Sequence, residues 1–151
     1  MPDRSPRIFS AADGVAAGAG DFILLVARVA MGCLFLAEGW LKLNNMSGTV
    51  AYLASLGAPS PGLASRAAMI TELTCGLALI FGVATRYAAL VIIGFTIVAT
   101  YLAHRFWLYP QPRAGNEEVH FYKNIALIGG ALALFWAGAG RFSLDAVLRR
   151  R

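Results

Sequence analysis

The sequence predicts an all-α integral membrane protein built as a bundle of four membrane-spanning helices. Hydrophobic residues make up 58% of the 151 residues and charged residues only 14%, whereas a soluble domain carries about 25% charged residues. The apolar residues also gather in four stretches, each close to the roughly 20 residues that a helix needs to cross hydrocarbon. Helices are expected because lipid-exposed backbone must satisfy its hydrogen bonds internally.

The chain divides into one membrane domain between two polar ends. Residues 1–20, polar and then rich in glycine and alanine, are predicted to form a disordered cytoplasmic tail, and residues 146–151 a short basic cytoplasmic tail. The membrane domain is predicted over residues 21–145. Its four spans are expected at about residues 22–43, 64–84, 87–104 and 121–139.

The connections between these spans carry signals of their own. Only Thr85 and Arg86 separate the second and third spans, which predicts a tight helical hairpin. Residues 50–56 predict a short helix at the membrane surface, ended by the glycine and the prolines that follow it. Trp107 and Tyr109, in the connection after the third span, fit an aromatic belt at the membrane interface.

The placement of arginine predicts that both termini lie in the cytoplasm, because cytoplasmic loops carry an excess of Lys and Arg. In that orientation the cytoplasmic side holds Arg4, Arg7, Arg86, Arg141, Arg149, Arg150 and Arg151. The opposite side holds Arg66, Arg105 and Arg113, with Lys42 and Lys123 at its border. The net charge of +5 is therefore interpreted as a topology signal, and no nucleic acid is predicted as a partner.

Six polar side chains fall within the same half of the membrane in this arrangement. They are Glu38 and Lys42 of the first span, Glu72 of the second, His104 of the third, and Lys123 with Asn124 of the fourth. Ionisable groups at membrane depth are costly and usually face a bundle interior or a cavity. We therefore predict that the six form one polar cluster, a candidate site for protons or for a polar ligand.

The first span carries a polar stripe, because Arg28, Glu38 and Lys42 share one face at 100° per residue. Glu38 and Lys42 form an i, i+4 pair in the favourable order, with Glu first. Glu72 suits either a proton or ligand site shared with Glu38 or a structural clasp with Lys42 or Lys123. Each of these lysines could instead snorkel to the headgroups. Arg28 is expected to anchor the structure, by snorkelling or by pairing with Asp21.

The third and fourth spans add two candidates with clear geometry. Thr96, Thr100 and His104 form one stripe, but threonines in membrane helices usually bond their own i−4 carbonyls, so only His104 counts as a candidate. Asn124 is expected to face the bundle and to hydrogen-bond across it. A small-residue face for close helix packing is predicted at Gly129, Ala133 and Ala137.

Cys33 and Cys75 lie singly, near the centres of the first two spans. Without a CxxC pair they signal neither a thioredoxin-like motif nor a zinc site, so we interpret them as two small buried hydrophobes. A disulfide or a thiol relay between them is the alternative. The sequence has no Gly-rich phosphate loop, no nucleophile elbow and no paired-histidine spacing, so it predicts no metal and specifies no reaction.

Several motifs resemble those of the DoxX family of small four-helix membrane proteins. The resemblance is carried by LFLAEGWLKL at 34–43, GTVAY at 48–52, LGAP at 56–59, Glu72–Leu73 followed by GLAL at 76–79, Gly82 with Thr85–Arg86, residues 121–130 with Lys123–Asn124, and GRFSLD at 140–145. Two positions depart from the family pattern: Glu38 stands where histidine is frequent, and Ala139 where a proline between glycines is common. A carboxylate at position 38 can still exchange protons.

The resemblance implies a multi-pass protein of the bacterial inner membrane. The family takes its name from a membrane subunit of a thiosulfate:quinone oxidoreductase, and some bacterial members are associated with thiol and oxidative-stress systems. It therefore implies a subunit of a quinone- or thiol-linked redox system, with quinone as the candidate cofactor and a redox subunit as a candidate partner within the lipid bilayer. One alternative is a scaffold or assembly protein with a structural polar core. The other is a carrier of small solutes or protons, for which a second copy of the chain is the expected partner.

Overall fold

The computed structural model describes residues 7–150, with side chains from residue 12 onward, and every regular element in that range is helical. The elements are α1 (Arg7–Asn44), α2 (Met46–Ser55), α3 (Pro61–Phe81), α4 (Thr85–Ala103), the short 3-10 helix η1 (Phe106–Leu108), α5 (Arg113–Ala137) and α6 (Leu144–Leu148). The stretches that are long and apolar enough to cross a membrane are Ala12–Asn44, Pro61–Phe81, Thr85–Leu108 and Arg113–Ala137. The predicted all-α architecture with four spans is confirmed.

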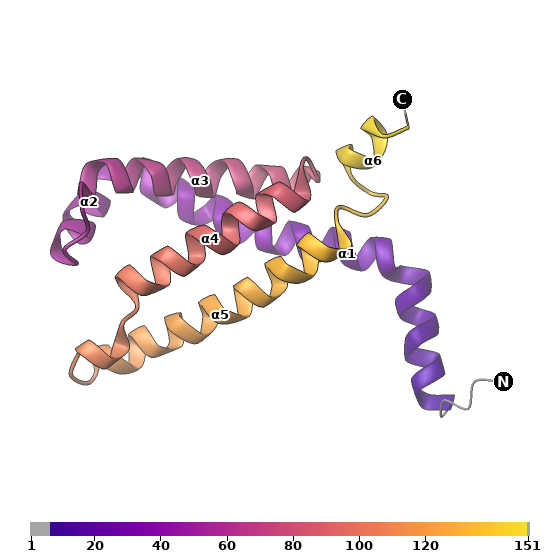
Figure 1. The fold of residues 1–151 in the computed structure, drawn as a ribbon, viewed down its shortest axis with the longest axis horizontal. Coiled ribbons are helices and arrows are strands. Elements are labelled where there is room, and N and C mark those ends of the chain that lie inside the picture. Colours follow the sequence, from indigo (N-terminus) through magenta and orange to yellow (C-terminus); the bar gives the residue numbers. More distant parts are fainter. Residues whose placement is uncertain (1–6, 151) are drawn as a thin grey trace.

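The four long helices run alongside one another, with α2 at one end of the bundle and α6 at the other (Figure 1). α1 packs mainly against α3 and α4 mainly against α5, while contacts between α3 and α4 join the two pairs. The N-terminal part of α1, indigo in Figure 1, bends away at the α6 end. In each span at most 28% of the apolar stretch is buried within the protein, which leaves a broad apolar surface for lipid.

Two helices begin earlier than expected. α1 starts at Arg7, so residues 7–20, which the sequence predicted to be disordered, are helical. Alanine is the strongest helix former, and a helix that is already nucleated extends at little cost. Residues 1–6 of the predicted tail lie outside the described residues. α5 starts at Arg113 rather than near residue 121, which adds two polar turns to the fourth span.

The tight hairpin between α3 and α4 is present, but its turn precedes Thr85 and Arg86, which form the first turn of α4. Gly82 ends α3 with φ +67°, a left-handed conformation that glycine adopts without strain. A Cβ atom on Gly82 would also overlap the guanidinium of Arg28 and would lie 2.5 Å from the Cβ of Ser143. Glycine is thus required here both by the turn and by the side chains that cover it.

Glycines bring α1 and α3 into close contact. A Cβ atom on Gly76 would lie 2.7 Å from the backbone nitrogen of Leu36 and 2.9 Å from the carbonyl oxygen of Gly32. A Cβ atom on Gly39 would lie 2.9 Å from the backbone nitrogen of Leu73. Small residues let membrane helices approach closely enough for van der Waals packing to hold them together, so these glycines fix the α1–α3 pair.

The small-residue face predicted on the fourth span is wrong, because it does not pack inward. Its exposed residues are Gly129, Ala133 and Ala137. α5 instead buries Glu117, Asn124, Ala131 and Leu134, and the last two join the apolar core. Glu117, Asn124 and Ala131 are spaced seven residues apart and therefore lie on one face of α5. This face, which begins with two polar side chains, turns inward instead of the predicted small-residue face.

The α6 end of the bundle is tied together by Arg28, which is fully buried. Its guanidinium donates hydrogen bonds to the carbonyl oxygens of Leu79 at 2.9 Å and Phe142 at 2.6 Å. The anchoring role predicted for Arg28 is confirmed, but neither predicted means of anchoring occurs. Asp21 instead accepts a hydrogen bond from the backbone N–H of Arg141 at 2.8 Å, and the carbonyls hold the arginine inside the bundle, where it cannot snorkel.

Candidate functional site

A cavity of about 470 Å³ lies at the α2 end of the bundle, between residues of α1, α2, α3, α4 and α5. We call it the α2-end cavity. All six residues of the predicted polar cluster line it: Glu38, Lys42, Glu72, His104, Lys123 and Asn124. Side chains from four separate segments of the sequence therefore meet around one space.

Lys42 is the centre of an ionic group that joins α1 to α3. Its Nζ lies 2.9 Å from Glu72 Oε2 and 3.3 Å from Glu38 Oε2. The predicted i, i+4 pair is confirmed, and Lys42 is the lysine that clasps Glu72. The Glu72 side chain is 6% exposed and that of Glu38 is 48% exposed. The two carboxylates therefore differ, since one is enclosed beside its lysine and the other reaches the surface.

His104 meets two residues that are absent from the predicted cluster. Its Nδ1 lies 2.8 Å from Glu117 Oε2, and its ring stacks on that of His120, with centroids 5.1 Å apart. His120 also lines the cavity. Glu117 is buried, and the half-exposed Arg113 approaches its other carboxylate oxygen at 3.7 Å. These residues form a chain of titratable and charged groups from the cavity to the surface of the bundle.

Glu117 and His120 are absent from the predicted cluster because the sequence predicts a connection, rather than a helix, over residues 105–120. The structure makes this stretch helical from Arg113 onward. Glu117, His120 and Asn124 then stand at i, i+3 and i+7, which places them on one helix face. That polar periodicity, running directly into the apolar span, is the signal by which the sequence could have revealed both residues.

Asn124 is held to α4 by a hydrogen bond across the bundle. Its Nδ2 donates to Thr100 Oγ1 at 2.9 Å, and Thr100 Oγ1 donates to the carbonyl oxygen of Thr96 at 2.6 Å. Both the crossing bond of Asn124 and the i−4 bond of Thr100 were predicted and are confirmed. Thr96 also lines the cavity, and its buried hydroxyl has no hydrogen-bond partner within the described part of the chain. An unpaired buried hydroxyl is costly, so Thr96 is an unsatisfied polar group in the cavity wall.

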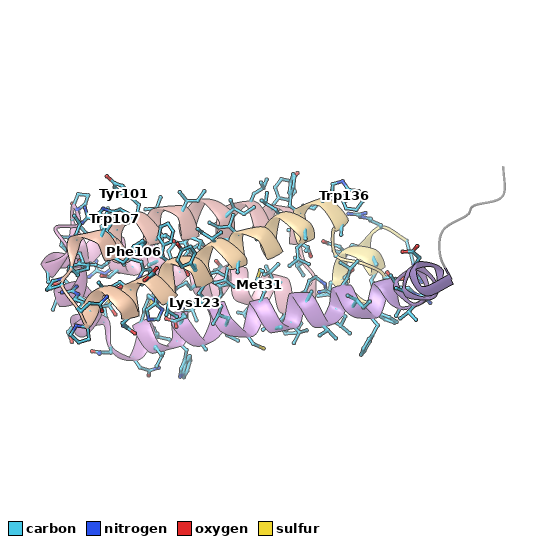
Figure 2. All side chains as sticks on the ribbon, turned by 90° about the horizontal axis from the view of Figure 1, so that it is seen from below. Met31, Tyr101, Phe106, Trp107, Lys123 and Trp136 are labelled. Atoms are coloured by element: carbon cyan, nitrogen blue, oxygen red, sulfur yellow. The ribbon has the colours of Figure 1, made fainter. Side chains whose placement is uncertain are left out.

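The remaining cavity wall is mainly apolar. Phe35 and Phe95 line it and pack edge to face, with ring centroids 6.4 Å apart. Tyr52 contributes from α2; burial raises the pKa of its phenol, and the negative charge of Glu117 raises it further, so the hydroxyl stays protonated at neutral pH. Lys123 of α5 (Figure 2) also lines the cavity but is exposed, and no carboxylate of the described residues forms an ion pair with it.

The two cysteines are free thiols. Cys75 is buried, as predicted, whereas Cys33 is exposed, because α1 turns Gly32 and Phe35 toward the bundle and leaves Cys33 on its outer side. The prediction of two buried hydrophobes is therefore correct for Cys75 only. Over the described residues, no group of three or more His, Cys, Asp and Glu side chains is placed to hold a metal ion.

Comparison with known proteins gives one family and two similar curated proteins. The family model described as DoxX matches residues 23–105. The inner membrane protein YphA of Escherichia coli strain K12 is 35% identical over 123 residues, covering 82% of this chain and 88% of that protein. The inner membrane protein YqjF of the same organism is 34% identical over 131 residues, covering 87% and 95%. No solved structure matches the chain.

Proposed function

The chain belongs to the DoxX family of inner-membrane proteins, and from its α2-end cavity we propose that it is the quinone-binding subunit of a membrane redox system. The observation that carries the proposal is the cavity, with about 470 Å³ of space inside mainly apolar walls. Ligand pockets typically have volumes of about 300–1,000 Å³ and combine apolar walls with a few polar groups. A quinone matches this surface, because its ring and tail are apolar and its two carbonyl oxygens accept hydrogen bonds.

The hydrogen-bond donors around the cavity suit those carbonyl oxygens. The Thr96 hydroxyl has no partner among the described residues, and the Tyr52 phenol is protonated. Lys123 brings an amine that no carboxylate in the described range neutralises. Phe35 and Phe95 provide aromatic surface against which a ring can pack. This donor set favours a ligand with acceptor oxygens on an apolar body.

A bound quinone supplies the redox chemistry, since two electrons from a partner enzyme and two protons convert it to a quinol. The residues of this chain bind and orient the ring and exchange the protons. His104 and Glu117, joined by the 2.8 Å contact, link the cavity to the half-exposed Arg113. Histidine and carboxylate groups within hydrogen-bond reach are suited to proton transfer. Lys42 beside Glu72 keeps the cavity wall close to electrical neutrality.

Calorimetric titration of the purified protein with decylubiquinone, in a mild detergent, tests the proposal. We expect saturable binding, weakened about fivefold by Asn124→Ala, because the Asn124 side chain lines the cavity and one hydrogen bond is worth about 1 kcal/mol. Asn116→Ala is the matched control, because Asn116 lies on the same helix, is exposed and does not line the cavity. Absence of saturable binding, or equal weakening by both variants, contradicts the proposal.

The ion pairs of Lys42 support a second candidate function, a membrane scaffold whose polar cluster only locks α1 to α3. On that view, Glu72→Gln leaves Lys42 with the exposed Glu38 alone and lowers the free energy of unfolding by up to about 3 kcal/mol. The double variant Lys42→Met with Glu72→Met removes both charges and restores most of the loss. Detergent unfolding curves measure both effects.

The same variants separate the two functions. If the cluster is only a lock, quinone binding per folded molecule is absent in the parent protein and in every variant. If the cavity is a quinone site, the double variant is stable but binds quinone more weakly than the parent. Deletion of the gene supplies the test in cells, because an unchanged ratio of quinol to quinone after deletion counts against the redox subunit.

A further inference from the structure

A second cavity, of about 390 Å³, lies at the α6 end, opposite the candidate quinone site. We call it the arginine cavity. Four arginines line it: Arg86, Arg141, Arg149 and Arg150. They come from the start of α4, from the loop after α5 and from the residues that follow α6, so arginines from three segments converge on one hollow.

The positive charge of the arginine cavity is poorly compensated. Asp145 also lines it, but its two carboxylate oxygens accept hydrogen bonds from the backbone N–H groups of Ala84 at 2.8 Å and Thr85 at 3.1 Å. Asp145 is therefore engaged in capping α4. Arg141 has one distant carboxylate, Asp21, at 3.9 Å.

The other three arginines of the cavity have no such partner. Among residues 12–150, no carboxylate forms an ion pair with Arg86, Arg149 or Arg150. Like charges held together repel one another, so a convergence of guanidinium groups favours an added anion. Guanidinium matches the oxygens of a phosphate through paired hydrogen bonds.

Exposed apolar residues alternate along residues 141–149 with those that line the arginine cavity. Phe142, Leu144, Val147 and Leu148 present large side chains to the surroundings. Trp136 lies at this end of the bundle (Figure 2) and is 82% exposed. A free phosphate ion would leave these side chains uncovered, whereas acyl chains attached to a phosphate would cover them. Basic pockets beside apolar surface at the ends of membrane helices are a recognised form of lipid headgroup site.

We propose that the arginine cavity binds the phosphate headgroup of an anionic phospholipid. Arg86 and Arg149 hold the phosphate oxygens, with Arg141 and Arg150 adding positive charge around them. The acyl chains lie against the exposed apolar side chains of Phe142, Leu144, Val147 and Leu148. Binding at this end ties α6 to the start of α4 through the lipid, and it is independent of what occupies the α2-end cavity.

The test uses the full chain with Trp40→Phe and Trp107→Phe, which leaves Trp136 as the fluorescent reporter at the α6 end. The protein is reconstituted in phosphatidylcholine vesicles that contain either brominated phosphatidylglycerol or brominated phosphatidylcholine. We expect brominated phosphatidylglycerol to quench Trp136 with about a fivefold preference, the effect of roughly one arginine at a membrane surface. Equal quenching by the two brominated lipids overturns the proposal.

Arginine variants locate the preference. Arg86→Gln and Arg149→Gln should each lower it at least twofold, while Arg66→Gln, an exposed arginine on α3 that lines neither cavity, should leave it unchanged. An equal loss with Arg66→Gln means general surface charge and overturns the proposal. Arg149 lies beyond α6 and outside the apolar core, so Arg149→Gln remains informative even where Arg86→Gln impairs folding.

Competition with inorganic phosphate distinguishes a lipid headgroup from a free phosphate ion as the occupant of the arginine cavity. Excess phosphate, compared with chloride at equal ionic strength, should leave the preference for phosphatidylglycerol intact if the acyl chains contribute to binding. Loss of the preference in phosphate alone means that the cavity takes an aqueous anion and overturns the lipid assignment. At equal ionic strength the phosphate and chloride solutions screen exposed charges equally. A difference between them therefore reports phosphate binding rather than screening.

Discussion

At the scale of single residues, Arg28 takes its role from its neighbours. An arginine within an apolar span can snorkel, pair with a carboxylate or bind backbone carbonyls. The last carbonyls of a helix have no partner inside the helix, and the end of α3 presents those of Leu79 and Ile80 to the guanidinium. The fork of N–H donors reaches Phe142 as well. One side chain thus connects α1, α3 and the chain after α5.

Arg28→Lys should destabilise the protein although it keeps the charge. A single ammonium cannot reach the carbonyls of both Leu79 and Phe142 in the same geometry, and the loss of one charged hydrogen bond costs about 1.5–3 kcal/mol. We expect a lower midpoint in detergent unfolding and faster proteolysis within residues 140–148. Arg66→Lys, at an exposed position, is the control. Equal stability of the two variants would show that Arg28 acts as a charge alone.

The partners of the polar residues could be predicted only in part. The sequence identified Glu38 as a partner of Lys42, because both lie on one helix at a favourable spacing. It left Glu72 with a choice between two lysines, and the structure selects Lys42. The partner of His104 lies thirteen residues further along the chain, beyond a connection of irregular backbone. Pairing across elements depends on how helices are rotated, which local spacing does not report.

At the scale of elements, hydropathy located the spans but misplaced the start of α5. Its first two turns are polar, and a hydropathy criterion assigns polar turns to a connection. They are helical here because tertiary contacts hold them: Glu117 meets His104, and the guanidinium of Arg113 lies 3.7 Å from the centre of the Tyr109 ring. Such contacts routinely override local propensity.

Two glycine substitutions separate a packing contact from helix propensity. Gly76→Ala should lower the free energy of unfolding by about 1–3 kcal/mol, because the new Cβ atom would lie 2.7 Å from the backbone nitrogen of Leu36. Gly129→Ala meets nothing within 4 Å and should be neutral or stabilising, since alanine is the better helix former. Unfolding in mixed micelles measures both. A neutral Gly76→Ala would contradict close packing of α1 on α3.

At the scale of the whole molecule, the two ends of the bundle differ in chemistry. The α2 end gathers carboxylates, histidines and both lysines of the chain around an apolar cavity. The α6 end gathers arginines at the surface, beside exposed apolar side chains. Arg28 and the glycine contacts hold the helices between them. This polarity along the bundle suits a protein that binds a ligand near one membrane face and lipid phosphates near the other.

The orientation of the bundle can be tested by fusion. We expect the α6 end to lie in the cytoplasm, because arginines concentrate in cytoplasmic loops and four of them line the cavity at that end. Green fluorescent protein fused after the last residue should then fluoresce, and alkaline phosphatase at the same place should be inactive. Phosphatase inserted between α2 and α3 should be active. The reverse pattern would place the α2-end cavity near the cytoplasmic face.

The sequence by itself determined the number of spans, the fold class and the residue types that gather near one end. These follow from local composition, because the transfer of an apolar segment into lipid depends on that segment alone. The tertiary structure decided which face of each helix turns inward. Glu117 thereby joined the site, Cys33 was left exposed, and the four arginines met around one cavity. Helix rotation depends on contacts between distant segments, so a local polar pattern such as that of Glu117, His120 and Asn124 can suggest an inward face but cannot name the partners on other helices.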